Sequence, residues 1–261
     1  MPIIYMASSN PTSSIIFFLL LTLGYSIFKY YTTSPKMIKM WSVIYFLILI
    51  SVQFFINLGV TTNICGFSQY GVALTTTLIP WIFIFGTMVF LLMMFPNWLN
   101  PFSNTIGYLF AYITGVDSFL KSILKDKTTL QLGKEQADMM SAINNVYTDK
   151  ALLINSITLE NIDTWWDRMS KGGLLKKESG PIGSEFYKKL LEFVKLKTQI
   201  AEYIWYALTG ILVTSVSYNY ILNSGCTQSA EEMEKRHNEY LAQEQKLSTA
   251  QKEQGKNQII Y

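Results

Sequence analysis

The two cysteines, Cys65 and Cys226, carry the most reactive side chains of this sequence. Neither belongs to a Cys-x-x-Cys pair or to a Cys/His spacing that binds metal. Each lies just outside a long apolar run, and we expect both on the same, non-cytoplasmic side of a membrane. That compartment can be oxidising, so a disulfide between them is one interpretation. Two small buried thiols are the other.

His237 is the single histidine, and it lies beside Lys235 and Arg236 in a charged segment, where a solvated side chain is expected. One histidine gives little support to a Ser-His-Asp triad or a multi-histidine metal site. Asp163 and Asp167 are spaced i, i+4, which predicts a solvated helix face. Walker, GxGxxG, GxSxG and HExxH motifs are absent from the sequence. We therefore predict no catalytic, cofactor-binding or metal-binding residues, and no enzyme.

Three polar side chains interrupt the apolar runs. Gln53 and Asn57 are spaced i, i+4 on one helix face, and we expect them to hydrogen-bond to other helices rather than line a pore. Glu202 begins the last apolar run. It is expected near an interface, in contact with headgroups or paired with Lys195 or Lys197. An acid that handles protons or ions is the alternative.

Trp165 and Trp166 form the most conspicuous polar-segment cluster, followed closely by Lys171, Lys176 and Lys177. Adjacent tryptophans on a helix point in different directions, so we expect one of them in a core. Whether the other also packs there or contacts a membrane or protein partner is left open. The lysines would suit an anionic membrane surface or an acidic partner, and a solvated loop is the alternative.

The amino-acid composition indicates the kind of fold that holds these residues in place. Half of the 261 residues are hydrophobic and 15% are charged, against roughly 25% charged in ordinary soluble domains. The net charge of +3 is too small to indicate nucleic-acid binding, and basic clusters with interleaved aromatics are absent from the sequence. No small-molecule substrate is evident either. The expected class is an all-α, polytopic membrane protein with about four transmembrane helices and a small helical extramembrane domain.

Four apolar runs are candidates for membrane spans, which need about 20 residues. Pro80 lies inside the third run and should kink it. The runs are residues 15–28 (extendable to 13–31), 40–58, 72–94 and 200–222.

Residues 95–108 separate the apolar and polar parts of the chain; they read Phe-Pro-Asn-Trp-Leu-Asn-Pro-Phe-Ser-Asn-Thr-Ile-Gly-Tyr. The two prolines stop a helix from passing straight through. Trp98, Phe102 and Tyr108 are side chains of the kind that settle at a membrane–water interface and are our candidates for contact with a partner. Residues 106–120 are expected to form an interfacial or re-entrant helix rather than a fourth full span in this place.

Lysines predict the orientation, because they concentrate on the cytoplasmic side. Lys29, Lys36 and Lys39 place the first link in the cytoplasm, and residues 95–199 then return there. Both termini fall on the opposite side. The predicted division is residues 1–94 as a three-span membrane part, 95–120 as an interfacial collar, 121–199 as a cytoplasmic-side helical domain, 200–222 as the fourth span and 223–261 as a polar helical tail.

Residues 95–108 resemble a stretch of small multi-span, membrane-anchored minor capsid proteins of large icosahedral DNA viruses, of the chlorella-virus and iridovirus kind. The resemblance covers about fourteen residues and, loosely, the layout of the spans. It implies an internal virion membrane beneath a protein shell, with this protein joining the two. The implied partners are the lipid bilayer and other capsid or membrane proteins.

The leading hypothesis is accordingly a structural virion membrane protein whose helical domain contacts the inner side of the capsid. The alternative is a channel, transporter or fusion-type membrane factor, with Gln53, Asn57, residues 75–77 and Glu202 along its path. Intramembrane charge is nearly absent from the sequence, which disfavours that alternative.

Overall fold

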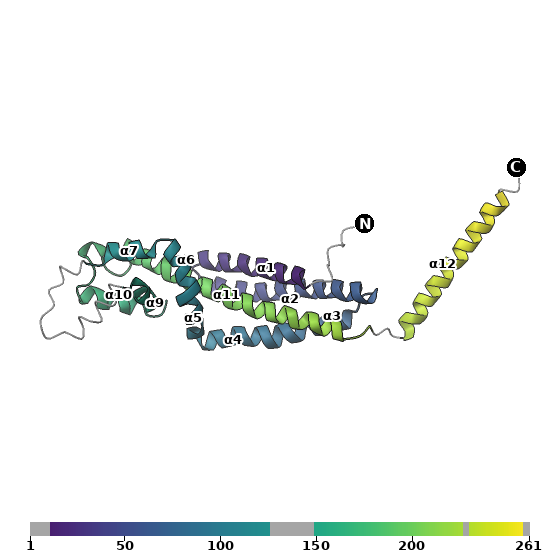
Figure 1. The fold of residues 1–261 in the computed structure, drawn as a ribbon, viewed down its shortest axis with the longest axis horizontal. Helices are drawn as coiled ribbons and strands as arrows, with labels where there is room; N and C mark the ends of the chain where they lie inside the picture. Colours follow the sequence, from purple (N-terminus) through teal and green to yellow (C-terminus); the bar gives the residue numbers. More distant parts are fainter. Residues whose placement is uncertain (1–10, 126–148, 227–229, 258–261) are drawn as a thin grey trace. The chain divides into compact units, whose positions relative to one another are not determined.

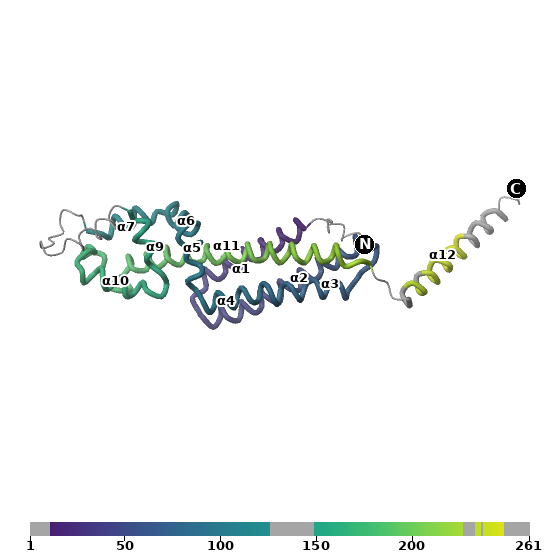
Figure 2. Tube along the Cα trace, turned by 60° about the horizontal axis from the view of Figure 1, so that its bottom comes forward, coloured from purple at the N-terminus to yellow at the C-terminus, as the bar shows by residue number. Residues whose placement is uncertain are grey.

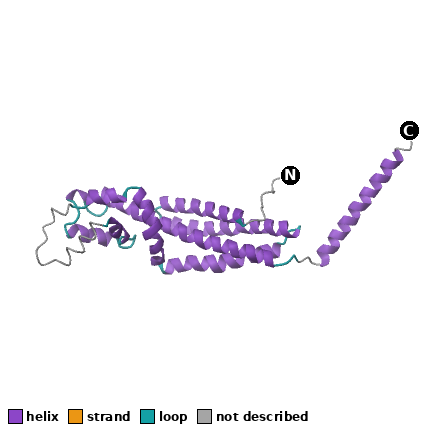
Figure 3. Cartoon of the chain, in the orientation of Figure 1, coloured by secondary structure: helices purple, strands orange, loops and turns teal. Residues whose placement is uncertain are grey.

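The chain is helical throughout the part that the structure describes, which is residues 11–125, 149–226 and 230–257 of a computed structural model. Within these ranges the β-structure is one isolated antiparallel bridge, Leu124 with Leu175, and Figure 3 shows helices joined by short loops. The predicted all-α class is confirmed. The chain divides into two compact units, Met1–Ile221 and Leu222–Tyr261.

Four stretches are long and apolar enough to cross a membrane, as predicted. Figures 1 and 2 show them side by side in the first unit. Their bounds exceed most of the predicted ones, because polar residues at the ends of the apolar runs continue the helices. They are α1 (Thr12–Tyr31), α2 (Pro35–Cys65), the stretch Tyr70–Met94 and α11 (Glu185–Asn223).

Helix α2 shows how the sequence sets these ends. Pro35 is its first residue, where a missing N–H costs nothing. Gly66 follows its last residue at φ +73°, the left-handed conformation that commonly terminates helices. With 31 residues the helix is about 46 Å long, more than the roughly 30 Å hydrocarbon core of a bilayer.

The third stretch is not one regular α-helix. It consists of α3 (Tyr70–Ile79), the π-helical segment η1 (Pro80–Gly86) and α4 (Thr87–Met94). Pro80 has no N–H to donate, so the regular i→i−4 ladder is interrupted at this residue. The sequence predicts a kink at Pro80, and the structure has the widened π-helical turn there.

The four stretches pack into a bundle that we call the membrane bundle, and the core of this bundle is aromatic. The ring of Phe18 lies 5.4 Å from Trp81 and 6.1 Å from Phe85, and Phe85 lies 5.6 Å from Tyr206, between ring centroids. Phe18 reaches this position because α11 has glycine at residue 210. A Cβ atom there would overlap the Phe18 ring. Close packing of this kind fixes how α1 and α11 cross.

A small helical domain surrounds the first part of α11. It comprises α7 (Val116–Ile123), α9 (Lys150–Asn155) and α10 (Ile162–Lys171), gathered at one end of the membrane bundle (Figure 1). Its core includes Ile123, Ile154, Trp166 and Leu190, all essentially without solvent exposure. One continuous helix, α11, therefore belongs to two cores.

Residues 106–120 do not form the single helix that we expect from the sequence. They are divided between α6 (Tyr108–Ile113) and α7, because Gly115 adopts φ +97°. Neither helix is long enough to cross a membrane. Helix α6 leaves Leu109, Phe110 and Ile113 exposed, as an interfacial helix would, whereas α7 buries its apolar face in the small domain.

The second unit consists mainly of α12 (Ala230–Asn257), which occupies the predicted polar tail. Its described side chains, from residues 233–235 and 237–247, are exposed. Among them are four large apolar ones: Met233, Tyr240, Leu241 and Leu247.

Candidate functional site

The collar between membrane bundle and small domain is built from three short helical turns. They are η2 (Pro96–Leu99), α5 (Asn100–Phe102) and η3 (Ser103–Gly107). Helix α4 ends at Met94, two residues before Pro96, the first of the two prolines, which agrees with the predicted break. The chain then runs across the end of the bundle toward α6 (Figures 1 and 2).

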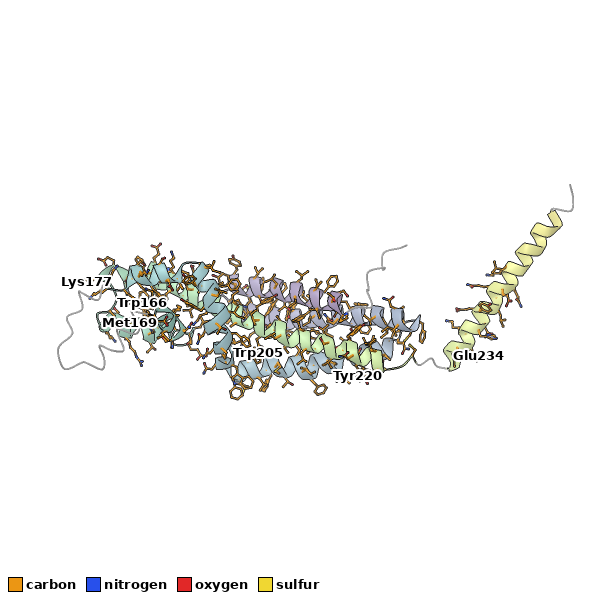
Figure 4. All side chains as sticks on the ribbon, viewed as in Figure 1. Trp166, Met169, Lys177, Trp205, Tyr220 and Glu234 are labelled. Carbon is orange, nitrogen blue, oxygen red and sulfur yellow. The ribbon has the colours of Figure 1, made fainter. Side chains whose placement is uncertain are left out.

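Four aromatic side chains join the collar to α11; we call Phe95, Trp98, Phe102 and Trp205 the aromatic collar. Phe95 stacks on Trp98 at 5.5 Å, and the Trp205 ring lies 6.3 Å from Trp98 and 5.8 Å from Phe102. Trp98 remains 44% exposed. Trp98 and Phe102 are among the predicted contact residues. Trp205, labelled in Figure 4, is not among them, yet it contacts both rings.

Tyr108 has a different environment from Trp98 and Phe102. Its hydroxyl donates to Asp117 Oδ1 at 3.4 Å, and its ring lies 6.1 Å from that of Tyr112. Burial, followed by the nearby Asp117 carboxylate, raises the pKa of Tyr108. The side chain thus connects α6 to α7 rather than joining the aromatic collar.

A polar junction lies where the collar, α9 and α11 meet; it consists of Asn104, Gly107, Ile154, Asn155 and Lys197. Lys197 is 2% exposed, and its Nζ donates to the Ile154 carbonyl at 2.9 Å and to Asn104 Oδ1 at 3.2 Å. Asn155 Nδ2 donates to the Asn104 carbonyl at 3.2 Å. A Cβ at residue 107 would overlap the Lys197 carbonyl, so only glycine allows this approach of collar and α11.

The Lys197 ammonium is buried without a carboxylate beside it. The ion pairs of the described residues are Lys29–Glu202 and Lys171–Asp167. Burial lowers the pKa of Lys197 to about 8, because a charged ammonium loses its hydration there. The two oxygen acceptors, the Ile154 carbonyl and Asn104 Oδ1, compensate part of this loss of hydration. Lys197 lies before residue 200 and therefore outside the predicted fourth span.

Gln53 and Asn57 hydrogen-bond between helices, as predicted. Ser14 Oγ donates to Gln53 Oε1 at 2.6 Å, which joins α1 to α2. Asn57 Nδ2 donates to Thr77 Oγ1 at 2.8 Å, which joins α2 to α3. Both amides are buried, so these bonds satisfy polar groups that would otherwise be costly within a membrane.

Glu202 is paired with Lys29 of α1, a partner that was not predicted from the sequence. Its carboxylate accepts from Lys29 Nζ at 2.5 and 2.6 Å, and the expected pairing with Lys195 or Lys197 is wrong. Helix spacing identifies only partners on the same helix, whereas Lys29 comes from α1. Lys195 instead lies 5.3 Å from the Tyr30 ring centre.

The two adjacent tryptophans have different surroundings. Trp166 is 1% exposed and its Nε1 donates to the Gly180 carbonyl at 3.2 Å, whereas Trp165 is half-buried against the same core. Trp166 is therefore a core residue, and Trp165 reaches the surface. Figure 4 shows Trp166 close to Met169 within the small domain.

The three candidate lysines lie at the end of α10 and in the segment that follows it. Lys171 pairs with Asp167 at 2.7 Å, but both side chains are largely exposed, so the pair contributes little stability. The backbone N–H of Lys176 donates to the Ile123 carbonyl at 2.9 Å, which holds this segment against α7. Lys177 is exposed, so Lys171 and Lys177 both present charge to solvent.

Asp163 and His237 have different surroundings. Asp163 accepts a hydrogen bond from Tyr187, and burial together with this carboxylate raises the pKa of Tyr187 to about 12. His237 is exposed on α12. The described residues contain no group of three or more His, Cys, Asp or Glu that could hold a metal ion.

Both cysteines are disulfide-bonded in the structure, and neither is a free thiol. Their location on an oxidising side of a membrane stays a prediction.

Comparison of the chain with protein-family models, with curated proteins and with solved structures finds no match.

Proposed function

We propose that this chain is a structural membrane protein that links a bilayer to a protein layer on its cytoplasmic face. The membrane bundle anchors the chain, and the small domain makes the contact. Following the resemblance of residues 95–108, the protein layer is the capsid shell around an internal virion membrane.

One observation carries the proposal: α11 is a single helix of 39 residues that enters both cores. Leu190 and Val194 pack in the small domain, whereas Tyr206 and Val213 pack in the membrane bundle. A continuous helix transmits force and orientation without a flexible linker. Such a connection suits a protein that holds two layers at a constant spacing.

The surroundings of the polar groups in the bundle favour a structural role over transport. Gln53 and Asn57 are bonded to neighbouring helices, and Glu202 is paired with Lys29. Thr75 donates its hydroxyl to the Gly71 carbonyl of its own helix. These groups hold helices together, so they do not offer a row of unpaired sites for a moving ion.

Exposed lysines at the end of α10 and in the segment after it provide a surface for the protein layer. Lys171 and Lys177 are exposed, and a partner with an acidic face would complement them. We expect the variant Lys171→Glu/Lys177→Glu to reduce the fraction of the protein that remains with shells after detergent removes the membrane. A loss of about fivefold or more corresponds to about 1 kcal/mol of binding free energy.

The matched control is Lys235→Glu/Lys246→Glu, which makes the same charge change at two exposed positions of α12. It should leave shell association unchanged. Carbonate extraction verifies that both variants remain inserted in membranes. Equal retention of the two variants, or complete absence of the wild-type protein from purified particles, would refute the proposed function.

A further inference from the structure

The membrane bundle contains a cavity of about 580 Å³ at the end nearest the small domain. Its walls are mainly apolar side chains of α2 and α4, among them Val43, Leu47 and Val89, and α1, η1 and α11 also contribute lining residues. This volume is in the range of small-molecule sites in proteins.

The cavity opens sideways toward the surface of the bundle. Val43, Leu47 and Met93 line it and are each 59% exposed or more, whereas Phe85 and Tyr206 at its floor are buried. On membrane-spanning helices, exposed apolar side chains face lipid. The cavity is therefore a groove that an acyl chain can enter directly from the bilayer.

The end of the groove near the small domain is polar and charged. Tyr25 and Ser42 are joined there by a 2.6 Å hydrogen bond between their hydroxyl oxygens. Lys29 and Glu202 also line this end, but their ion pair is neutral as a unit. Lys39 is exposed, lines the same end, and has no acidic partner among the ion pairs of the described residues.

We propose that this groove binds one anionic phospholipid, with an acyl chain between α2 and α4 and the headgroup phosphate at Lys39. A row of apolar side chains that ends in one uncompensated cation matches an acyl chain that ends in a phosphate. The net charge at the polar end selects an anionic lipid over a zwitterionic one. This inference does not depend on what the small domain contacts.

The site can be tested with the full chain in detergent micelles. Two lipids are added in separate experiments, dioleoylphosphatidylglycerol and dioleoylphosphatidylcholine, and native mass spectrometry counts the bound lipid molecules. We expect the wild-type protein to bind phosphatidylglycerol about fivefold more tightly. Lys39→Gln should remove most of this preference. Lys36→Gln, an exposed lysine of the same helix that does not line the groove, should retain it.

A second pair of variants tests the acyl-chain position. Val43→Trp fills the groove and should reduce the bound lipid by one molecule for both probes. Ile48→Trp, on α2 and also exposed but outside the lining, should bind as the wild type does. Equal affinity of the wild type for both lipids, equal effects of the two lysine variants, or full binding by Val43→Trp would each overturn the proposal. Lipid binding is measured without shells, so its failure is separate from failure of the tether function.

Discussion

Replacing Gly210 with leucine should destabilise the membrane bundle by about 3 kcal/mol or more, the upper end of the cost of overpacking a core. A Cβ at this position would already overlap the Phe18 ring. Phe18 is completely buried against Trp81 and Phe85, so it cannot move aside without displacing the aromatic core. Titration of the purified protein with sodium dodecyl sulfate in mixed micelles measures the free energy of unfolding.

Gly24→Leu is the matched control, because it makes the same substitution in α1, where no atom lies within 4 Å of the added Cβ. It should change stability by less than about 0.5 kcal/mol, as surface substitutions usually do. Gly210→Ala combined with Phe18→Leu should recover much of the stability that Gly210→Ala loses. If Gly210→Leu and Gly24→Leu unfold alike, α1 and α11 do not cross as described.

Lys197→Met should abolish a rise in stability that the wild-type protein shows between about pH 8 and pH 10.5. The ordinary pKa of a lysine side chain is 10.5, and the pKa of Lys197 in the folded protein is about 8. In this interval the unfolded chain binds the proton and the folded chain does not, so stability increases with pH. At neutral pH both states are protonated, and the folded protein carries the full cost of the buried charge.

The expected size follows from the difference between the two pKa values. Each unit of difference between the two pKa values corresponds to about 1.36 kcal/mol of unfolding free energy. The stability of the wild type relative to Lys197→Met should therefore increase by about 3 kcal/mol from pH 7 to pH 10.5. Comparing the two proteins at each pH removes the contribution of other titrating groups, including Tyr187. A constant difference across this range would show that the Lys197 ammonium is hydrated rather than held in the junction.

The four helical stretches that could cross a membrane were predictable from the sequence because hydrophobicity over about 20 residues is a local property. The same is true of the helix break at Pro96 and of the interhelical role of Gln53 and Asn57, since buried amides in a bundle must find partners on other helices. Each of these predictions depends only on residues that are close together in the sequence: an apolar run, a proline or a polar side chain within an apolar run.

The partners of individual charges were not predictable in the same way. Glu202 pairs with Lys29, 173 positions earlier in the chain, and Lys197 is buried by the collar and α9. Both outcomes depend on which faces of the helices meet. Glycines at 107 and 210 allow those close approaches, but a glycine in a helix does not indicate from sequence alone what will pack against it.

Helix α11 runs uninterrupted from the small domain into the membrane bundle, and the proposed function depends on this continuity. Spin labels at Lys188 and Leu212, both exposed on α11, test it by double electron–electron resonance in nanodiscs. At the rise of an α-helix their Cα atoms are about 36 Å apart. A single narrow distance distribution near this value is the predicted result. A broad distribution, or a maximum well below 36 Å, would show a hinge between the two cores and contradict the proposed rigid connection.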